Sequence, residues 1–164
     1  PVQAIDFLPT GNAVVSASLD GSLRAFDSVR YRNFRTFTTP TPVQFTSVGV
    51  EPGGEMVCAG TLETFEIFIW NVQNGRLLEV LKGHEAPISS LKFHPADGGL
   101  ASASWDGTVK LWDIYKSTAA VDTFEHPSDV LALSVRPDGK QLACCTLDGQ
   151  IHLWDIENGE ELGY

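Results

Sequence analysis

The sequence predicts an all-β protein composed of about four repeats, each a four-stranded antiparallel sheet. Residues 83–113 open with Gly-His, close with Trp-Asp, and place an Asp-Gly pair six residues before the tryptophan. The aromatic residues Phe26, Trp70, Trp112 and Trp154 then follow one another at intervals of 44, 42 and 42 residues. Short β-branched and aromatic runs, typical of strands, are separated by Pro-x-Gly and Asp-Gly turns. A period of about 40–45 residues with four strands per unit is that of a β-propeller blade.

The four repeats are called blades one to four in chain order. Their expected boundaries are residues 1–38, 39–81, 82–124 and 125–164. In blade two, the third strand is expected from Phe65 to Asn71, because this run is rich in β-formers. Blade one begins inside its first strand and blade four breaks off in its last. We therefore expect the blades to be a fragment of a larger propeller.

Composition and charge exclude several classes of protein. With 43% hydrophobic and 20% charged residues, the chain is globular rather than disordered. The apolar runs have the length of strands, so we expect no transmembrane helix and no membrane partner. A net charge of −10 is unsuited to nucleic-acid binding over the whole surface. The cysteines are odd in number and fall in expected inner strands, which favours a reduced intracellular setting: Cys58, Cys144 and Cys145.

The repeated marks resemble those of the WD40-repeat family along the whole chain. In that family a His before the first strand, a Ser or Thr on the second, an Asp in the next turn and a Trp on the third strand form a buried hydrogen-bond network. The resemblance implies a complete set in blade three: His84, Ser102, Asp106 and Trp112. Because a fully satisfied buried network rigidifies a core, we expect blade three to be the best ordered.

The other blades carry incomplete versions of this network. Blade four has three of the marks, with Cys144 in place of the hydroxyl residue: His126, Asp148 and Trp154. Blade one has Phe26 at the tryptophan position, and a phenyl ring cannot donate a hydrogen bond. Blade two lacks the hydroxyl and the turn aspartate.

The residues His84, Ser102 and Asp106 also have the composition of a hydrolase triad. The structural interpretation is favoured, because the same marks recur in other blades and no G-x-S-x-G elbow is present. There is also no P-loop and no H-E-x-x-H motif. We therefore expect no catalytic residue, no metal site, no cofactor and no small-molecule substrate.

The resemblance further implies a protein-binding rim, formed just before each turn aspartate and at the start of each first strand. Trp105 is the strongest candidate, since exposed tryptophans often anchor interfaces. The alternative is that Trp105 packs against the neighbouring blade. The candidate residues are Leu19, Leu62, Pro87, Ser89, Trp105, Asp129, Leu131 and Leu147, together with Gln44 and Thr46.

A second candidate surface is the segment from Arg30 to Arg35, where basic and aromatic residues alternate. Such a pattern suits RNA phosphates and base stacking, with Arg30, Arg32 and Arg35 as the candidate RNA-binding residues. It equally suits an outer strand with solvated arginines, or a contact with an acidic protein.

Two irregular segments indicate a narrower resemblance. RYRNFRTFTTP, beginning at residue 30, and FEIFIW, beginning at residue 65, are not needed in a general WD40 blade. Both resemble the periodic tryptophan protein 2 family. That resemblance implies a nucleolar, non-catalytic scaffold in the small-subunit processome, which acts in 18S ribosomal RNA processing. Its implied partners are protein subunits of a large ribonucleoprotein, with a peripheral RNA contact as a second expectation. The alternative is a WD40 adaptor in another intracellular complex.

Overall fold

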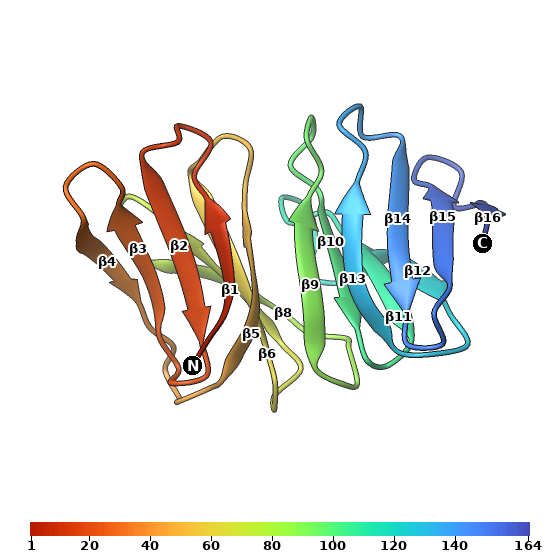
Figure 1. The fold of residues 1–164 in the computed structure, drawn as a ribbon, viewed down its shortest axis with the longest axis horizontal. Coiled ribbons are helices and arrows are strands. Elements are labelled where there is room, and N and C mark those ends of the chain that lie inside the picture. The colour runs from red at the N-terminus through yellow and green to blue at the C-terminus, as the bar shows by residue number, and fades with distance from the viewer.

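The computed structural model describes all residues from 1 to 164 and is all-β. Its strands form four separate four-stranded sheets, and every neighbouring pair of strands within a sheet is antiparallel and consecutive in the chain (Figure 1). This confirms the predicted fold class. No segment forms a helix long and apolar enough to span a bilayer.

Each blade contributes one sheet. Blade one contains β1 (Val2–Phe7), β2 (Ala13–Ser18), β3 (Leu23–Asp27) and β4 (Arg32–Phe37). Blade two contains β5 (Phe45–Val50), β6 (Met56–Thr61), β7 (Ile67–Asn71) and β8 (Leu77–Leu81). Blade three contains β9 (Ile88–Phe93), β10 (Leu100–Ser104), β11 (Thr108–Trp112) and β12 (Ala120–Glu125). Blade four contains β13 (Val130–Val135), β14 (Gln141–Thr146), β15 (Ile151–Asp155) and β16 (Glu161–Gly163).

The third strand of blade two begins two residues later than the sequence predicts. β7 starts at Ile67 rather than Phe65, and Phe65 has a positive φ of 59° in the preceding loop. The cause is Thr61, whose hydroxyl accepts from Glu66 N at 2.9 Å and lies 3.0 Å from Glu66 O. These contacts hold residues 61–66 in a tight loop, so β7 can begin only after Glu66. The extra residue that blade two has before its tryptophan therefore lies in this loop and not in the strand.

Adjacent blades pack face to face through apolar side chains. Between blades three and four, small and β-branched residues of β10 and β11 meet larger residues of β13 and β14. This cluster contains Ala101, Ala103, Val109, Val130, Leu133 and Leu142. Two similar clusters join blade one to blade two and blade two to blade three. Each fully buried aliphatic side chain contributes about 1.5–3 kcal/mol, so these interfaces supply most of the core.

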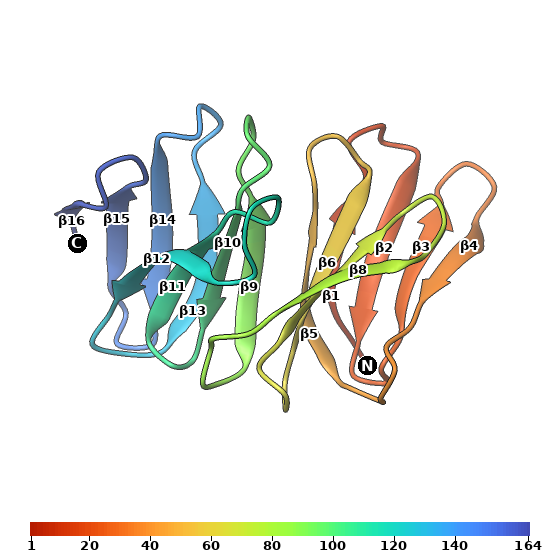
Figure 2. The ribbon, with the colours of Figure 1, turned by 180° about the vertical axis from the view of Figure 1, so that it is seen from behind.

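The four blades form a curved row that is not closed into a ring (Figure 2). The inner strands β1, β5, β9 and β13 are neighbours in that order. The outermost faces of the row remain open. Val2 and Ile5 on blade one are 61% and 64% exposed, and Ile151 on blade four is 60% exposed. Val109, which stands one repeat before Ile151, is fully buried by the next blade.

Candidate functional site

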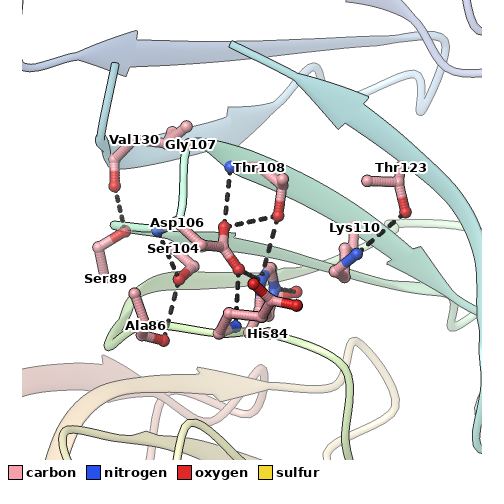
Figure 3. A network of polar contacts seen from close by, with 12 residues as sticks. His84, Ala86, Ser89, Ser104, Asp106, Gly107, Thr108, Lys110, Thr123 and Val130 are labelled. Carbon is pink, nitrogen blue, oxygen red and sulfur yellow. Dashed lines mark hydrogen bonds and ion pairs between the residues drawn. The ribbon is translucent and has the colours of Figure 1, made fainter. Parts of the chain in front are cut away.

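The polar network of blade three joins residues from three separate segments. His84 lies before β9, and its Nδ1 is 2.7 Å from Asp106 Oδ2 in the β10–β11 turn (Figure 3). The other ring nitrogen, Nε2, is 2.7 Å from Ser102 Oγ on β10. Trp112 Nε1 donates to the same Ser102 oxygen at 2.8 Å. All four predicted side chains thus lie in one hydrogen-bonded chain.

The direction of these hydrogen bonds follows from the donors available. Trp112 has only an N–H to give, so Ser102 Oγ accepts from it and donates its own proton to His84 Nε2. His84 Nδ1–H then donates to Asp106, which assigns the tautomer. Burial alone would raise the pKa of Asp106, but hydrogen bonds from His84, Thr108 and the Glu85 amide outweigh it and lower that pKa.

The same geometry resembles that of a hydrolase triad, because a serine, a histidine and an aspartate are hydrogen-bonded in that order. Ser102 is fully buried, however, and its oxygen already accepts from the Trp112 indole. Two surface grooves, of about 400 and 330 Å³, are lined by neither Ser102 nor His84. The arrangement can hold a turn in place, but it offers no access for a substrate.

Blade four departs from this pattern. Trp154 Nε1 donates directly to His126 Nε2 at 3.0 Å, and Cys144 Sγ lies 3.1 Å from the same nitrogen. His126 Nδ1 is 3.2 Å from the Gly107 carbonyl of blade three. Asp148 instead accepts from Thr146 Oγ1 at 2.5 Å within its own turn. The expectation that Asp148 joins the network is therefore wrong, because the ring of His126 is turned toward the neighbouring blade.

Blade two replaces the polar network with aromatic packing. Trp70 is fully buried, and its Nε1 donates to the Thr38 carbonyl at 3.1 Å. The ring centroids of Phe37, Phe45 and Phe68 lie 5.9, 5.8 and 5.8 Å from that of Trp70. The many phenylalanine residues between Phe34 and Trp70 could have indicated this aromatic cluster from the sequence.

The predicted protein-binding residues largely come together. A groove of about 330 Å³ is formed at the ends of the strands where β2–β3, β6–β7 and β10–β11 turn. Seven of the ten candidates line it: Leu19, Thr46, Leu62, Pro87, Ser89, Trp105 and Leu131. Trp105 is 46% exposed within this groove, so it is not covered by the neighbouring blade. We call this feature the leucine–tryptophan groove.

The remaining candidates have other positions. Asp129 and Leu147 lie outside the groove lining, and the Leu147 amide donates to the Asp129 carbonyl at 2.9 Å. Gln44 bonds to Glu63 at 3.4 Å. Gln3 lines the groove but was not predicted. It stands at the position in β1 that Thr46 takes in blade two, and this equivalence was the available signal.

Two hydroxyl groups at the groove connect the blades. Thr46 Oγ1 donates to the Ile88 carbonyl at 2.6 Å, and Ser89 Oγ donates to the Val130 carbonyl at 2.6 Å. Each bond runs from the first strand of one blade to that of the next. These side chains therefore fix the shape of the groove in addition to lining it.

The structure leaves fewer free cations in the arginine segment than its sequence indicates. Arg35 is half-buried, and its Nη2 donates to the Gln73 carbonyl of blade two. Arg30 lies 3.7 Å from Asp27 in an exposed ion pair. Only Arg32 is exposed without a side-chain partner. Because RNA affinity grows with the number of phosphates neutralised, these contacts reduce the number of guanidinium groups that are free to meet a phosphate.

No cluster of three or more histidine, cysteine, aspartate or glutamate side chains is arranged to hold a metal ion. The three cysteines are free thiols. Burial raises the pKa of the Cys144 thiol to about 12, so it stays protonated at neutral pH.

Comparison with known proteins places the chain in a family. The family described as "WD domain, G-beta repeat" matches residues 1–27, 75–113 and 119–155. The longest unmatched stretch, residues 28–74, contains the irregular segments of blades one and two; residues 114–118 and 156–164 are also unmatched.

Among known proteins, Periodic tryptophan protein 2 of Arabidopsis thaliana is 52% identical over 125 residues, which are 76% of this chain and 14% of that protein. The Mus musculus homolog is 57% identical over 101 residues, 62% of this chain and 11% of the mouse protein. The Saccharomyces cerevisiae protein is 50% identical over 97 residues, 59% of this chain and 10% of the yeast protein. The chain thus spans only a small part of each relative. The family match covers more than half of the chain, and the chain belongs to the WD40-repeat family.

Proposed function

We propose that this chain is part of a non-catalytic scaffold that assembles protein subunits of the small-subunit processome in the nucleolus, for the production of 18S ribosomal RNA. The processome assignment rests on resemblance to the periodic tryptophan protein 2 family, supported by identities of 44 to 57% to relatives of that name.

The observation that carries the binding role is the leucine–tryptophan groove. Its lining draws on all four blades, so a partner seated there would contact the whole row at once. Trp105 stands half-exposed beside leucines, and such a side chain gives a partner a large apolar anchor. The hydroxyl bonds of Thr46 and Ser89 hold the groove in shape before a partner arrives, which reduces the ordering cost of binding.

A protein partner is favoured over RNA because both candidate surfaces are poor in free cations. The leucine–tryptophan groove is lined by apolar and uncharged side chains, with no arginine or lysine among them. In the arginine segment of blade one, Arg32 is the one exposed arginine without a side-chain or backbone partner for its guanidinium. Neither surface supplies the several phosphate contacts on which RNA affinity depends.

A segment exchange in yeast tests the proposal. The stretch of yeast Periodic tryptophan protein 2 that aligns with this chain is replaced by the chain itself. We expect the chimera to sediment with the U3 small nucleolar RNA and to sustain 18S ribosomal RNA production. A stable chimera that fails to enter that particle would overturn the processome assignment. Four blades of an unrelated WD40 protein serve as the control and should fail.

The groove is tested within the same chimera by Trp105→Ala. This change removes the apolar anchor and should release the chimera from the particle. Leu78→Ala is the matched control, because Leu78 is 45% exposed against 46% for Trp105 but lies on the outer strand β8. If the two variants behave alike, the groove is not the binding site.

A further inference from the structure

A second groove, of about 400 Å³, lies between blades three and four. It is built at the β9–β10 and β11–β12 turns, whereas the leucine–tryptophan groove includes the β10–β11 turn, so the two grooves lie at opposite ends of β10. The second groove continues the apolar interface of the two blades, because four side chains of that interface also line it: Ala101, Leu111, Val135 and Ile156. Leu100 and Trp112 complete its apolar floor. We call it the inter-blade groove.

The groove lies where blade three has a smaller residue than blade two. The register of the inner strands gives the equivalent positions, since two pairs correspond: Leu100 with Trp112, and Val57 with Trp70. The residue before the first member of each pair is Gly99 in blade three and Met56 in blade two. The Met56 side chain packs in the apolar cluster between blades two and three. Gly99 has no side chain to fill the same place between blades three and four.

The facing strand increases this deficit. Phe93 is the last residue of β9 and Val135 is the last residue of β13. Phe93 is 8% exposed in the cluster between blades two and three, whereas Val135 is only partly buried and lines the groove. The interface of blades three and four thus lacks two large apolar groups that fill its counterpart. A well-packed interface has few such voids.

The third interface fills this place in another way. Leu8, in the β1–β2 turn, is buried in the cluster between blades one and two. His94 takes the corresponding position in blade three, one residue after the first strand. Its ring is held at blade four instead, with Nε2 2.9 Å from the Gly139 carbonyl. His94 therefore lines the groove at its edge and leaves the floor open.

An aromatic side chain is held at the lip of the inter-blade groove. Tyr115 lines the groove and is 63% exposed. Its ring packs on Gly98, where a Cβ atom would lie 3.0 Å from the ring and where φ is +72°. Only glycine combines that backbone conformation with such a close approach. The tyrosine ring thus has a fixed place and an open surface, against which a second aromatic ring can pack.

The charged groups of the lining are already paired within their own turns. Lys116 Nζ donates to Asp113 Oδ2 at 2.8 Å. The Asp97 carboxylate accepts from the Gly99 amide at 2.9 Å. The lining contains no other lysine, arginine, aspartate or glutamate. The apolar floor, rather than a free charge, is therefore what the groove offers to a ligand.

We propose that the inter-blade groove binds an uncharged segment of a partner protein that presents a phenylalanine side chain. The ring of that side chain takes the place that Met56 and Phe93 fill between blades two and three. It lies on the floor formed with Trp112 and packs beside Tyr115. An aromatic side chain buries a large apolar area when it is seated in this way. This proposal does not depend on the leucine–tryptophan groove or on the processome.

Methyl NMR spectroscopy of the chain in the presence of a peptide tests the proposal. The probe is acetyl-Gly-Gln-Phe-Gln-Gly-amide, and the comparison peptide has alanine in place of phenylalanine. We expect the probe to shift the methyl signals of Leu111, Val121 and Val135, which line the groove, and to leave those of Leu19 and Leu62 unchanged. The alanine peptide should bind roughly tenfold more weakly or less, because it buries no ring.

Two variants fill the groove in the way that blade two fills its own interface. Gly99→Met and Val135→Phe should each weaken binding of the probe by about tenfold or more. Gly99 has no positive φ, and a Cβ atom there would come no closer than 3.2 Å to any atom, the Asp97 carboxylate oxygen. The melting temperature should be unchanged or raised, because an apolar groove is filled.

Gly163→Met is the matched control, because an added Cβ atom at Gly163 would meet nothing within 4 Å and Gly163 lies outside the groove. It should leave the affinity unchanged. Wild-type affinity in either filled variant, with folding checked by thermal unfolding, would overturn the proposal. Loss of binding in Ile151→Ser would place the peptide on the open face of blade four and would also overturn it. So would methyl shifts at Leu19 and Leu62 alone, or no shifts at about 10 mM peptide.

Discussion

Blades three and four share one sequence frame but hold their tryptophans in different ways. In blade three the Trp112 indole donates to Ser102, whose hydroxyl passes a hydrogen bond on to the histidine. In blade four the Trp154 indole reaches His126 directly, with the Cys144 thiol beside it. A hydroxyl accepts and donates strongly, whereas a thiol does both weakly. The exchange of oxygen for sulfur at this position therefore decides whether a side chain bridges the tryptophan and the histidine by hydrogen bonds.

The difference changes what each histidine holds together. His84 bonds to Asp106, which also accepts from the Glu85 amide at 3.0 Å, so the β10–β11 turn is tied to the segment before β9. His126 instead faces the Gly107 carbonyl and ties blade four to blade three. All members of the blade three network belong to blade three, whereas the blade four network includes a hydrogen bond to the Gly107 carbonyl of blade three.

The largest expected effect is that of Asp106→Ala. It leaves the His84 N–H, the Glu85 amide and Thr108 without their acceptor, and we expect a loss of about 3 kcal/mol in the free energy of unfolding. Urea denaturation measures this. Asp148→Ala is the control and should cost much less, because Asp148 bonds only within its own turn. Equal losses would show that the two turn aspartates have the same role.

Exchanging the hydroxyl and the thiol should have the next largest effect. Ser102→Cys weakens two hydrogen bonds at a fully buried site, and we expect it to cost about 2 kcal/mol. Cys144→Ser restores an acceptor beside Trp154 and should gain up to about 1 kcal/mol. Thermal unfolding of both variants gives the comparison. A stabilising Ser102→Cys would contradict the assigned roles.

A smaller effect is expected from Thr108→Val, a change of nearly constant volume. Thr108 Oγ1 donates to Asp106 Oδ1 at 2.6 Å (Figure 3), and blade four has Gln150 at the corresponding position. We expect a loss of about 1 kcal/mol together with a rise in the pKa of Asp106, which titration by NMR follows. An unchanged Asp106 pKa would mean that the hydroxyl does not support the carboxylate.

The smallest and most gradual effect concerns pH. Burial lowers the pKa of His126 from its ordinary value of 6.5, so the unfolded chain binds a proton before the folded chain does. The free energy of unfolding is therefore not reduced by His126 above pH 6.5, and it decreases as the pH drops from 6.5 toward the lowered pKa of the folded state. Asp106 has a lowered pKa too, but its contribution is lost only in the acid range where carboxylates protonate.

Hydrogen exchange measured between about pH 7 and pH 5 can separate these two events. We expect the amides of β13 to β15 to lose protection first, while those of β10 and β11 remain protected. The His152 ring lies 4.9 Å from the His126 ring between centroids, and its Nδ1 is 2.6 Å from Glu161 Oε1. The variant His152→Gln tests whether His126 alone is responsible. Simultaneous loss of protection in both blades would show that they do not differ in their response to acid.

The resemblance to WD40 repeats implied the polar network of blade three, and the strand order explains why its members meet. The order of His84, Ser102, Asp106 and Trp112 places them in a loop, a strand, a turn and a strand, and strand pairing then brings them to one place. Ser102 pairs with Lys110, two residues before Trp112, so the indole can reach back to the hydroxyl. The same resemblance misled at Asp148, because the family pattern does not reveal which way the ring of His126 turns.

The sequence by itself determined the repeat, the strands, the turns and the family resemblance, since these depend on short-range periodicity and on turn residues. Only the tertiary structure decided which side chains are free. Arg35 is tied to another blade, whereas Trp105 is left half-exposed. A groove of about 400 Å³ lined by Leu100, Trp112 and Val135 was not predicted at all, since its lining comes from segments of two different blades. Alternation assigns a residue to a face of its sheet, but exposure depends on what the neighbouring sheet places against that face.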